Sequence, residues 1–288
     1  LPRIEQIGIN LQFLSLWIPP DHMGDRALHR AMRLVSCFYA ARRNNPGLRL
    51  VTSIADISTK LPGFCLALEG AEPLADDPEL LDAFYALGVR MIALTWNGRN
   101  SFADGIMVGE RPGAITHLGN KLLQQMQELG IVLDLAHLAE AGFWHALELT
   151  IGPVVVSHAN ARAICNHPRN LSDTQLRAIA ERDGVVGVCF VPKFLSGSEA
   201  TLDDVVLHIL HMIEVAGTDH VGLGGDFDGV TSLPHGLGGV QDLPAITVRL
   251  LESGLTQETI AKILGGNWRR VLAAVWCQES LETARIEC

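Results

Sequence analysis

The feature that most constrains the fold is a strand–helix–strand unit in the middle of the chain. Two short apolar runs rich in β-branched residues, Ile131–Leu135 and Pro153–Val156, flank an apolar-periodic segment, Ala139–Thr150, that predicts a helix. Strands joined by such a helical crossover are parallel. Each run leads directly into a histidine, His137 or His158, so both imidazoles are predicted at carboxyl ends of parallel strands.

The remainder of the chain repeats this alternation of strand and helix. Further strands are predicted at Ile7–Ile18, Gly63–Glu69, Val89–Thr95, Val185–Val191 and His220–Gly224. Helices are predicted over residues 25–44, 78–87, 118–129, 172–182, 201–215, 244–253 and 257–275. Such alternation is typical of α/β proteins with a parallel sheet covered on both faces.

The preferred architecture is a (β/α)₈ TIM barrel. We expect a single domain over residues 1–288, with the C-terminal helices of residues 244–276 packing on the barrel. Seven strands are predicted where a barrel has eight, so one strand is missed, the barrel is open, or the first strand lies before Leu1. A doubly wound open sheet is the alternative.

Charge and composition limit the classes of binding partner and the cellular location that we expect. A net charge of −10 without any Lys/Arg run argues against nucleic acid or an anionic membrane surface. No apolar run reaches the ~20 residues of a membrane-spanning helix, and no secretory signal opens the chain. The cysteines lack a CxxC pair and are expected to be reduced: Cys37, Cys65, Cys165, Cys189, Cys277 and Cys288. We therefore expect a cytoplasmic location.

Four predicted strands end in side chains that bind metals or move protons. They are Glu69, His137, His158 and, in the sequence GGDFDG, Asp226. The carboxyl ends of barrel strands form the rim where active sites are built. Imidazole and carboxylate ligands suit Zn²⁺ with an open coordination position. Each residue alone has a structural alternative: a core histidine, a glutamate paired with an arginine, or a simple Gly/Asp turn.

Three further residues carry weaker patterns. Arg169, in the sequence NHPRN, follows the second histidine strand and could bind a substrate carboxylate bidentately or form a structural ion pair. His208 and His211 have i, i+3 spacing on a predicted helix. Because helices lie outside a barrel, we interpret this pair as packing.

Six segments together resemble the membrane (renal-type) dipeptidases, peptidase family M19 of the amidohydrolase superfamily. They are LALEG, VRMIALTWNGRNSFADG, DLAH, VVVSHANARAICNHPRNLSD, GLGGDFDGV and GGNWRRVL, and the resemblance runs almost end to end along the chain. The resemblance implies a (β/α)₈ barrel with two zinc ions. It also implies hydrolysis of dipeptides, some with a D-residue in the second position, by a metal-bridging hydroxide. Related enzymes are often dimers, so a homodimer is compatible with it.

The resemblance also assigns roles to individual residues. Glu69 would bridge the metals, and His137 and His158 would hold the second one. Arg169 would bind the substrate carboxylate, and Asp226 would bind the substrate's amino end or relay a proton.

Two departures from the family bear on the site. The family's first strand carries a His-x-Asp pair that completes the first metal site, and we expect that strand to lie upstream of Leu1. Two zinc ions per chain are then expected, and one if the strand is absent. After the third predicted strand, Trp96 and Asn97 stand where mammalian members place a substrate-contacting histidine, so we predict that both contact substrate.

Three functions remain open from the sequence. The first is a zinc dipeptidase, the second another metal-dependent amidohydrolase acting on an N-acyl amino acid or a lactam. A need for a free amino terminus in the substrate separates these two. The third is a non-catalytic relative without the first metal site, which the intact set of strand-end residues argues against.

Overall fold

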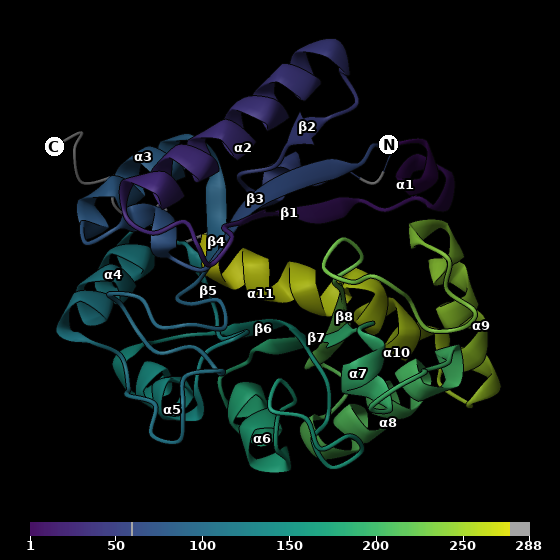
Figure 1. The fold of residues 1–288 in the computed structure, drawn as a ribbon. Helices are drawn as coiled ribbons and strands as arrows, with labels where there is room; N and C mark the ends of the chain where they lie inside the picture. The colour runs from purple at the N-terminus through teal and green to yellow at the C-terminus, as the bar shows by residue number, and fades with distance from the viewer. Residues whose placement is uncertain (59, 277–288) are drawn as a thin grey trace, which may run out of the picture. The chain divides into compact units, whose positions relative to one another are not determined.

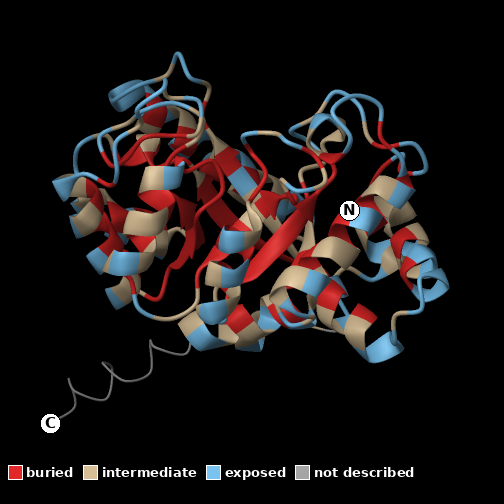
Figure 2. Cartoon of the chain, turned by 90° about the horizontal axis from the view of Figure 1, so that it is seen from below, coloured by how far each residue is buried: buried red, intermediate tan, exposed pale blue. Residues whose placement is uncertain are grey.

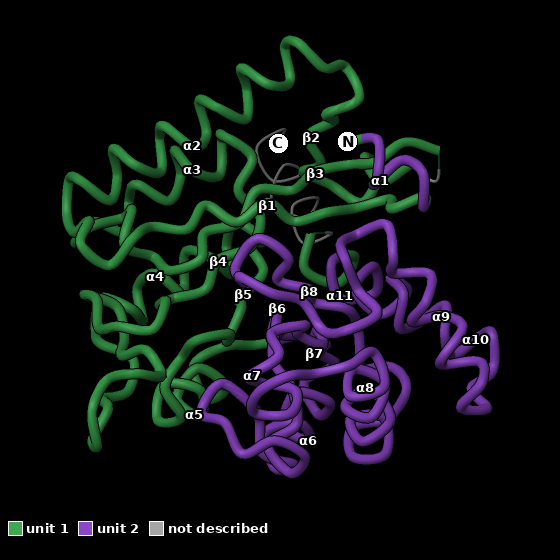
Figure 3. The backbone as a smooth tube through the Cα atoms, turned by 45° about the vertical axis from the view of Figure 1, so that its right-hand side comes forward, with its two compact units in different colours: residues 1, 8–151, 273–288 green, residues 2–7, 152–272 purple. Residues whose placement is uncertain are grey.

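The computed structural model describes residues 1–58 and 60–276, which fall into two compact units (Figure 3). Unit 1 contains Leu1, Gly8–Ile151 and the described residues from Ala273 on. Unit 2 contains Pro2–Ile7 and Gly152–Leu272. Both units are α/β, and every strand pair within them is parallel. The single domain expected over residues 1–288 stays a prediction.

In the sheet of unit 1, the carboxyl ends of β1, β3, β4 and β5 lie opposite one another. Its strands are β1 (Leu11–Trp17), β2 (Arg49–Leu50), β3 (Gly63–Glu69), β4 (Val89–Ala93) and β5 (Val132–Asp134). β3 pairs with β1 and β4, and β4 pairs with β5 (Figure 1). Glu69 lies opposite both Trp17 and Ala93, and Ala93 lies opposite Asp134. Loops leaving β3, β4 and β5 therefore start from one edge.

Helices of unit 1 follow the strands. They are α2 (Asp25–Asn44), α3 (Leu81–Ala86), α4 (His117–Glu128) and α5 (Glu140–Leu149), with 3₁₀ turns at Ile54–Asp56, Glu72–Leu74 and Pro78–Leu80. The bounds of α4 follow from local chemistry. The Thr116 side chain accepts from the Gly119 N–H at its start, and Gly130 adopts a positive φ of 67° just past its end.

Unit 2 repeats the pattern with fewer strands. Its strands are β6 (Val155–Ala159), β7 (Val185–Cys189) and β8 (Val221–Gly225), paired in that order. Its helices are α1 (Pro2–Ile7), α6 (Asp173–Glu181), α7 (Pro192–Leu195), α8 (Leu202–Ala216), α9 (Leu243–Glu252) and α10 (Gln257–Ala261), with a 3₁₀ turn at Val240–Asp242 and a π-helical turn at Lys262–Gly266. The helix α11 (Asn267–Trp276) begins in unit 2 and ends in unit 1.

The buried core combines strand residues with apolar residues of the helices and loops (Figure 2). β4 and β7 are buried at all five of their positions, as expected for parallel strands covered on both faces. The core of unit 2 also contains His208, which is fully buried. Its Nδ1 accepts from the Ala161 N–H at 3.0 Å, and its Nε2 lies 2.9 Å from the Leu195 carbonyl oxygen. The packing interpretation of His208 is therefore confirmed.

The structure differs from the predicted elements mainly at the start of the chain. A strand was expected from Ile7, but Pro2–Ile7 forms α1, which ends where Gly8 adopts a φ of 72°. The short strand β2 has only two residues and gives no periodic signal. Elsewhere, the predicted strands match the observed strands to within a few residues, and β3 matches at both ends.

Two further observations concern the chain as a whole. Among the described residues, no helix is both long and apolar enough to cross a membrane. The four described cysteines, Cys37, Cys65, Cys165 and Cys189, are free thiols, as predicted. Cys277 and Cys288 lie outside the described residues.

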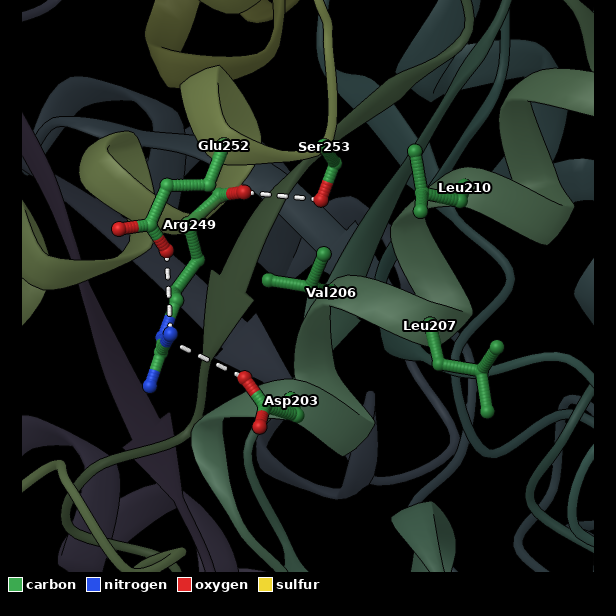
Figure 4. A pocket seen from close by; sticks show the side chains of 7 residues that line it. All are labelled: Asp203, Val206, Leu207, Leu210, Arg249, Glu252 and Ser253. Carbon is green, nitrogen blue, oxygen red and sulfur yellow. Dashed lines mark hydrogen bonds and ion pairs between the residues drawn. The ribbon is translucent and has the colours of Figure 1, made fainter.

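A surface pocket of about 300 Å³ lies on unit 2 between α8 and α9 (Figure 4). Arg249 of α9 spans its rim, 3.3 Å from Asp203 and 3.0 Å from Glu252. These side chains are about half exposed or more, so water screens the ion pairs. None of the predicted site residues lines the pocket.

Candidate metal centre

Glu69 and His137 meet at the carboxyl edge of the sheet in unit 1. Glu69 is the last residue of β3, and His137 follows β5. The His137 Nε2 lies 3.1 Å from the Glu69 Oε1, and the two side chains are 7% and 18% exposed. Two donor atoms bound at about 2.1 Å to one metal ion lie roughly 3 Å apart, so this spacing fits shared coordination. The strand-end argument from the sequence placed these two residues correctly.

The second carboxylate oxygen of Glu69 also has a partner, a hydroxyl that donates a hydrogen bond to it. Ser15, on the neighbouring strand β1, donates a hydrogen bond from its Oγ to Glu69 Oε2 at 2.7 Å. The carboxylate therefore presents one oxygen to the imidazole and the other to a hydroxyl, which fixes its plane. Sequence reasoning missed Ser15, because a single serine within an apolar strand carries no motif.

His137 is positioned by its backbone and by its ring. Its φ of 66° is in the left-handed region, which is uncommon for a residue with a Cβ atom. Its carbonyl oxygen accepts from the Ile106 N–H at 2.7 Å, and its Nδ1 lies 2.8 Å from Asn97 Oδ1. Metal-ligating histidines usually have such a partner on the second ring nitrogen. The donor set and its support therefore fit a metal ion.

Trp96 packs beside the same ring. Its ring centroid lies 5.9 Å from that of His137 and 5.4 Å from that of Trp17, with an edge-on geometry toward Trp17. The structure thus places both Trp96 and Asn97 next to His137. The substrate contacts expected of these two residues stay predictions.

The buried carboxylate of Asp104 stabilises the loop after Asn97 through hydrogen bonds. Asp104 is 4% exposed and accepts hydrogen bonds from the Arg99 guanidinium, one of them at 2.7 Å. It also accepts from the Gly113 N–H. The hydrogen bond from Arg99 is the main cause that lowers the pKa of Asp104 below its usual range. The loop therefore has a defined conformation next to His137.

Glu72 is a partly buried residue that sequence reasoning also missed, and its Oε2 atom is buried. It lies three residues after Glu69, and its Oε1 accepts from Asn100 Nδ2 at 3.1 Å. Burial is the largest influence on this group and raises its pKa. A charged Glu72 is therefore costly in the folded protein.

In unit 2, His158 lies on β6 where the pairing with β7 shifts register between Val156 and Ala159. Such irregularities change the direction in which side chains near a strand end point. The His158 Nδ1 lies 2.7 Å from the Ser157 Oγ, and His158 as a whole is 8% exposed. The carbonyl oxygen of His158 accepts from Arg169 Nη2 at 3.0 Å. Arg169 is therefore placed beside the histidine strand.

Arg169 is buried, with 6% of its surface exposed. Its guanidinium carbon lies 5.7 Å from the centre of the Phe194 ring, and its backbone N–H donates to His167 Nδ1 at 3.1 Å. Burying a guanidinium without partners costs free energy. A buried arginine is therefore typically paired with another group or needed for function.

Asp226 follows β8 in a tight turn. It has a φ of 65°, and its carbonyl oxygen accepts from the Gly229 N–H at 3.2 Å. A Cβ atom at position 229 would lie 2.1 Å from Asp226 Oδ1, so a larger residue there would displace the Asp226 carboxylate. The sequence GGDFDG thus forms a turn, and this turn sets the backbone that carries Asp226.

The sequence of the chain matches a known protein family. The model of the membrane dipeptidases, peptidase family M19, matches residues 1–284. The chain belongs to peptidase family M19. The resemblance found in the sequence is therefore confirmed.

Two curated relatives align with most of this chain. An uncharacterized protein in the pqqA 5′ region of Klebsiella pneumoniae is 41% identical over 246 residues, which cover 80% of this chain and 90% of that protein. An uncharacterized dipeptidase of Schizosaccharomyces pombe is 40% identical over 210 residues, covering 72% of this chain and 51% of the yeast protein.

Solved M19 structures match closely. The metallopeptidase "dipeptidase AC" of family M19 has a TM-score of 0.90 at 28% identity, covering 96% of this chain and 88% of its own. A metallopeptidase from Rhodobacter sphaeroides, liganded with a phosphinate mimic of the dipeptide L-Ala-D-Ala, has a TM-score of 0.90 at 27% identity, covering 96% and 89%. The fold class predicted from the sequence is confirmed: the M19 chain is α/β, with a parallel sheet consistent with a (β/α)₈ barrel.

Proposed function

We propose that this M19 chain is a zinc-dependent dipeptidase. The observation that carries the proposal is the Glu69–His137 pair, a carboxylate and an imidazole 3.1 Å apart at the carboxyl edge of a parallel sheet. Membership of a metallo-dipeptidase family supports the same reading. The resemblance to the family adds His158 as a further ligand. The mixed oxygen and nitrogen donors favour Zn²⁺.

In the proposed mechanism, Glu69, His137 and His158 hold the metal. Zinc, when bound, acts as a Lewis acid that makes water nucleophilic at neutral pH. Two zinc ions are expected if a further strand supplies a His-x-Asp pair, and one if it does not. The support for Glu69 from Ser15 and for His137 from Asn97 keeps both ligands oriented before substrate arrives.

The other residues would act on the substrate. Arg169 binds the carboxylate of the dipeptide through its guanidinium, which matches a carboxylate in shape and charge. Asp226 binds the substrate's amino end or relays a proton to the leaving amine. Trp96 and Asn97 contact the substrate next to His137. Dipeptides with a D-residue in the second position are expected substrates, since the Rhodobacter sphaeroides relative binds a mimic of L-Ala-D-Ala.

Hydrolysis of L-Ala-D-Ala by the purified protein tests the proposal, measured as release of free alanine. We expect activity that is lost on chelation, restored by zinc, and abolished in His158→Ala. The matched control is His145→Ala, at a histidine for which we predict no role. Full activity of His158→Ala would contradict the proposal.

A second candidate is an amidohydrolase for N-acyl amino acids. It is favoured by the likeness to an amidohydrolase from Pseudomonas aeruginosa, which has a TM-score of 0.87 at 25% identity. N-acetylated L-Ala-D-Ala separates the two candidates. A dipeptidase that recognises the free amino group rejects this compound, whereas an N-acyl amidohydrolase accepts it.

A further inference from the structure

The segment that carries Trp96 and Asn97 is a short loop of unit 1, and one side chain closes its base. The Asn100 Nδ2 donates a hydrogen bond to the Leu94 carbonyl oxygen at 2.7 Å, across six positions of the chain. Leu94 is fully buried, whereas Trp96 and Asn97 are partly exposed. Asn100 therefore joins the end of the loop to a buried residue at its start.

The side chain of Asn100 uses its full hydrogen-bonding capacity. An asparagine amide has two N–H donors and an oxygen that accepts two hydrogen bonds. The second donor bond goes to Glu72 Oε1 at 3.1 Å. The Oδ1 accepts from the backbone N–H groups of Phe102, at 2.9 Å, and Ala103, at 3.2 Å, and both of these residues are buried. Rotating the amide by 180° would bring donor against donor and oxygen against oxygen, so these partners fix its orientation.

Gly105 packs against the same loop. A Cβ atom at this position would lie 2.2 Å from the Trp96 carbonyl oxygen and 2.5 Å from the Asn97 carbonyl carbon. The Gly105 N–H donates to the Gly98 carbonyl oxygen at 2.9 Å. The backbone of the loop thus has a close neighbour at Gly105 in addition to the closure at its base.

The loop places an aromatic ring beside the candidate metal centre, because the Trp96 ring centroid lies 5.9 Å from that of His137. We propose that Asn100 is a positioning residue, whose four hydrogen bonds hold the Trp96 ring at the place where it contacts the substrate. The contact with substrate rests on the proposed function, whereas the placement of the ring by Asn100 does not.

Two substitutions remove the donors of Asn100. Asn100→Asp keeps the shape and one acceptor oxygen, but it sets a second oxygen against the oxygens of Leu94 and Glu72. Asn100→Ser also offers an acceptor but adds no charge, so it tests the inference even if repulsion prevents Asn100→Asp from folding. The matched control is Asn44→Asp, the same chemical change at an exposed position on α2.

The first readout is the kinetics of L-Ala-D-Ala hydrolysis at saturating zinc. We expect kcat/KM to fall by about 10- to 100-fold in both Asn100 variants, mainly through KM, because a displacement of about 1 Å at a substrate-binding group has effects of this size. Asn44→Asp should match wild type.

A double-mutant cycle separates positioning of Trp96 from a general effect on the fold. In a Trp96→Ala background, Asn100→Ser should raise KM by no more than about twofold, since two substitutions that act through one contact are not additive. An equal rise in KM in both backgrounds would overturn the inference, as would an unchanged KM in the Asn100 variants.

The second readout does not depend on activity. Fluorine NMR of protein labelled with fluorotryptophan reports the surroundings of each indole ring, and Trp96→Phe and Trp268→Phe assign two of the signals. We expect the Trp96 signal to shift or broaden in the Asn100 variants, and the signal of Trp268, which belongs to unit 2, to stay unchanged. An unchanged Trp96 signal would overturn the inference.

Failure of the proposed function has a different signature. Wild-type protein that does not hydrolyse L-Ala-D-Ala would contradict the dipeptidase assignment, and the fluorine signals would still decide whether Asn100 holds the Trp96 ring.

Discussion

The Oγ of Ser15 lies 2.7 Å from Glu69 Oε2, and the two residues are 54 positions apart in the chain. Parallel pairing of β1 with β3 brings them together, because Ser15 lies in register with Ala67, two residues before Glu69. The hydroxyl thus supports a candidate metal ligand from a neighbouring strand.

This contact predicts a moderate loss of zinc affinity in Ser15→Ala. Removing a hydrogen-bonding partner of a metal ligand typically costs about 10- to 100-fold, and we expect the lower end because Ser15 is exposed to water. Chelator competition measures the affinity. Ser15→Thr keeps the hydroxyl and is expected to bind zinc nearly as well as wild type, so an equal loss in both variants would argue against the hydrogen bond as the cause.

Arg169 offers a test of substrate recognition. We expect Arg169→Lys to raise KM for L-Ala-D-Ala by about ten- to a hundredfold, since a charge-assisted bidentate contact is worth about 1.5–3 kcal/mol. The variant should retain its zinc. The C-terminal amide of the same dipeptide lacks the carboxylate, so its KM should not change. A similar rise in KM for the amide would mean that Arg169 acts on the fold of the site and not on the carboxylate.

Glu72 predicts an unusual pH dependence of stability. Burial raises its pKa in the folded protein above the ordinary value of 4.5. Its contribution to stability is therefore fully present below that value and is lost as pH rises through the folded pKa. Glu72→Gln keeps the oxygen that accepts from Asn100, and we expect it to raise Tm at neutral pH but to match wild type in acid.

Thermal unfolding at several pH values measures this difference. Glu79→Gln, at an exposed position in the same part of the chain, serves as the control and should leave Tm unchanged. A lower Tm for Glu72→Gln at neutral pH would show that the charged form of Glu72 is stabilised in the folded protein.

His208 should behave as a structural residue. His208→Leu leaves the Ala161 N–H and the Leu195 carbonyl oxygen without their hydrogen-bonding partner in the core. An unsatisfied buried polar group costs about 1–3 kcal/mol, so we expect a lower free energy of unfolding in urea. Zinc affinity should be unchanged. Loss of zinc without loss of stability would contradict the packing interpretation.

His208 also predicts a pH dependence. Burial lowers its pKa below the ordinary value of 6.5, so its contribution to stability is present above that value and is lost as pH falls toward the folded pKa. The difference in stability between wild type and His208→Leu should therefore shrink below about pH 6.5.

The sequence predicted what depends on local pattern. Apolar runs located the parallel strands, and residues that follow those runs, Glu69 and His137, meet at the sheet edge as expected. At the chain start the predicted strand began too early, because Ile7 is the last residue of helix α1 and β1 begins only at Leu11. A short amphipathic stretch there gives no clear period.

The supporting residues could not be predicted in this way. Asn97 and His137 are 40 positions apart, and their contact depends on a loop conformation set by Gly105 and by the Asp104 carboxylate. The burial that raises the pKa of Glu72 is likewise a result of tertiary packing. Spacing along the chain contains no signal for such contacts.

The most direct test of the proposed function is the zinc content per chain of wild type and of Glu69→Gln, after expression with zinc and removal of loosely bound metal. A neutral amide at position 69 keeps the size of the side chain but is a much poorer ligand than a carboxylate. We predict at least one zinc ion per wild-type chain and a clear loss of zinc in the variant. Equal zinc in both proteins, or none in wild type, would contradict the metal centre proposed at Glu69 and His137.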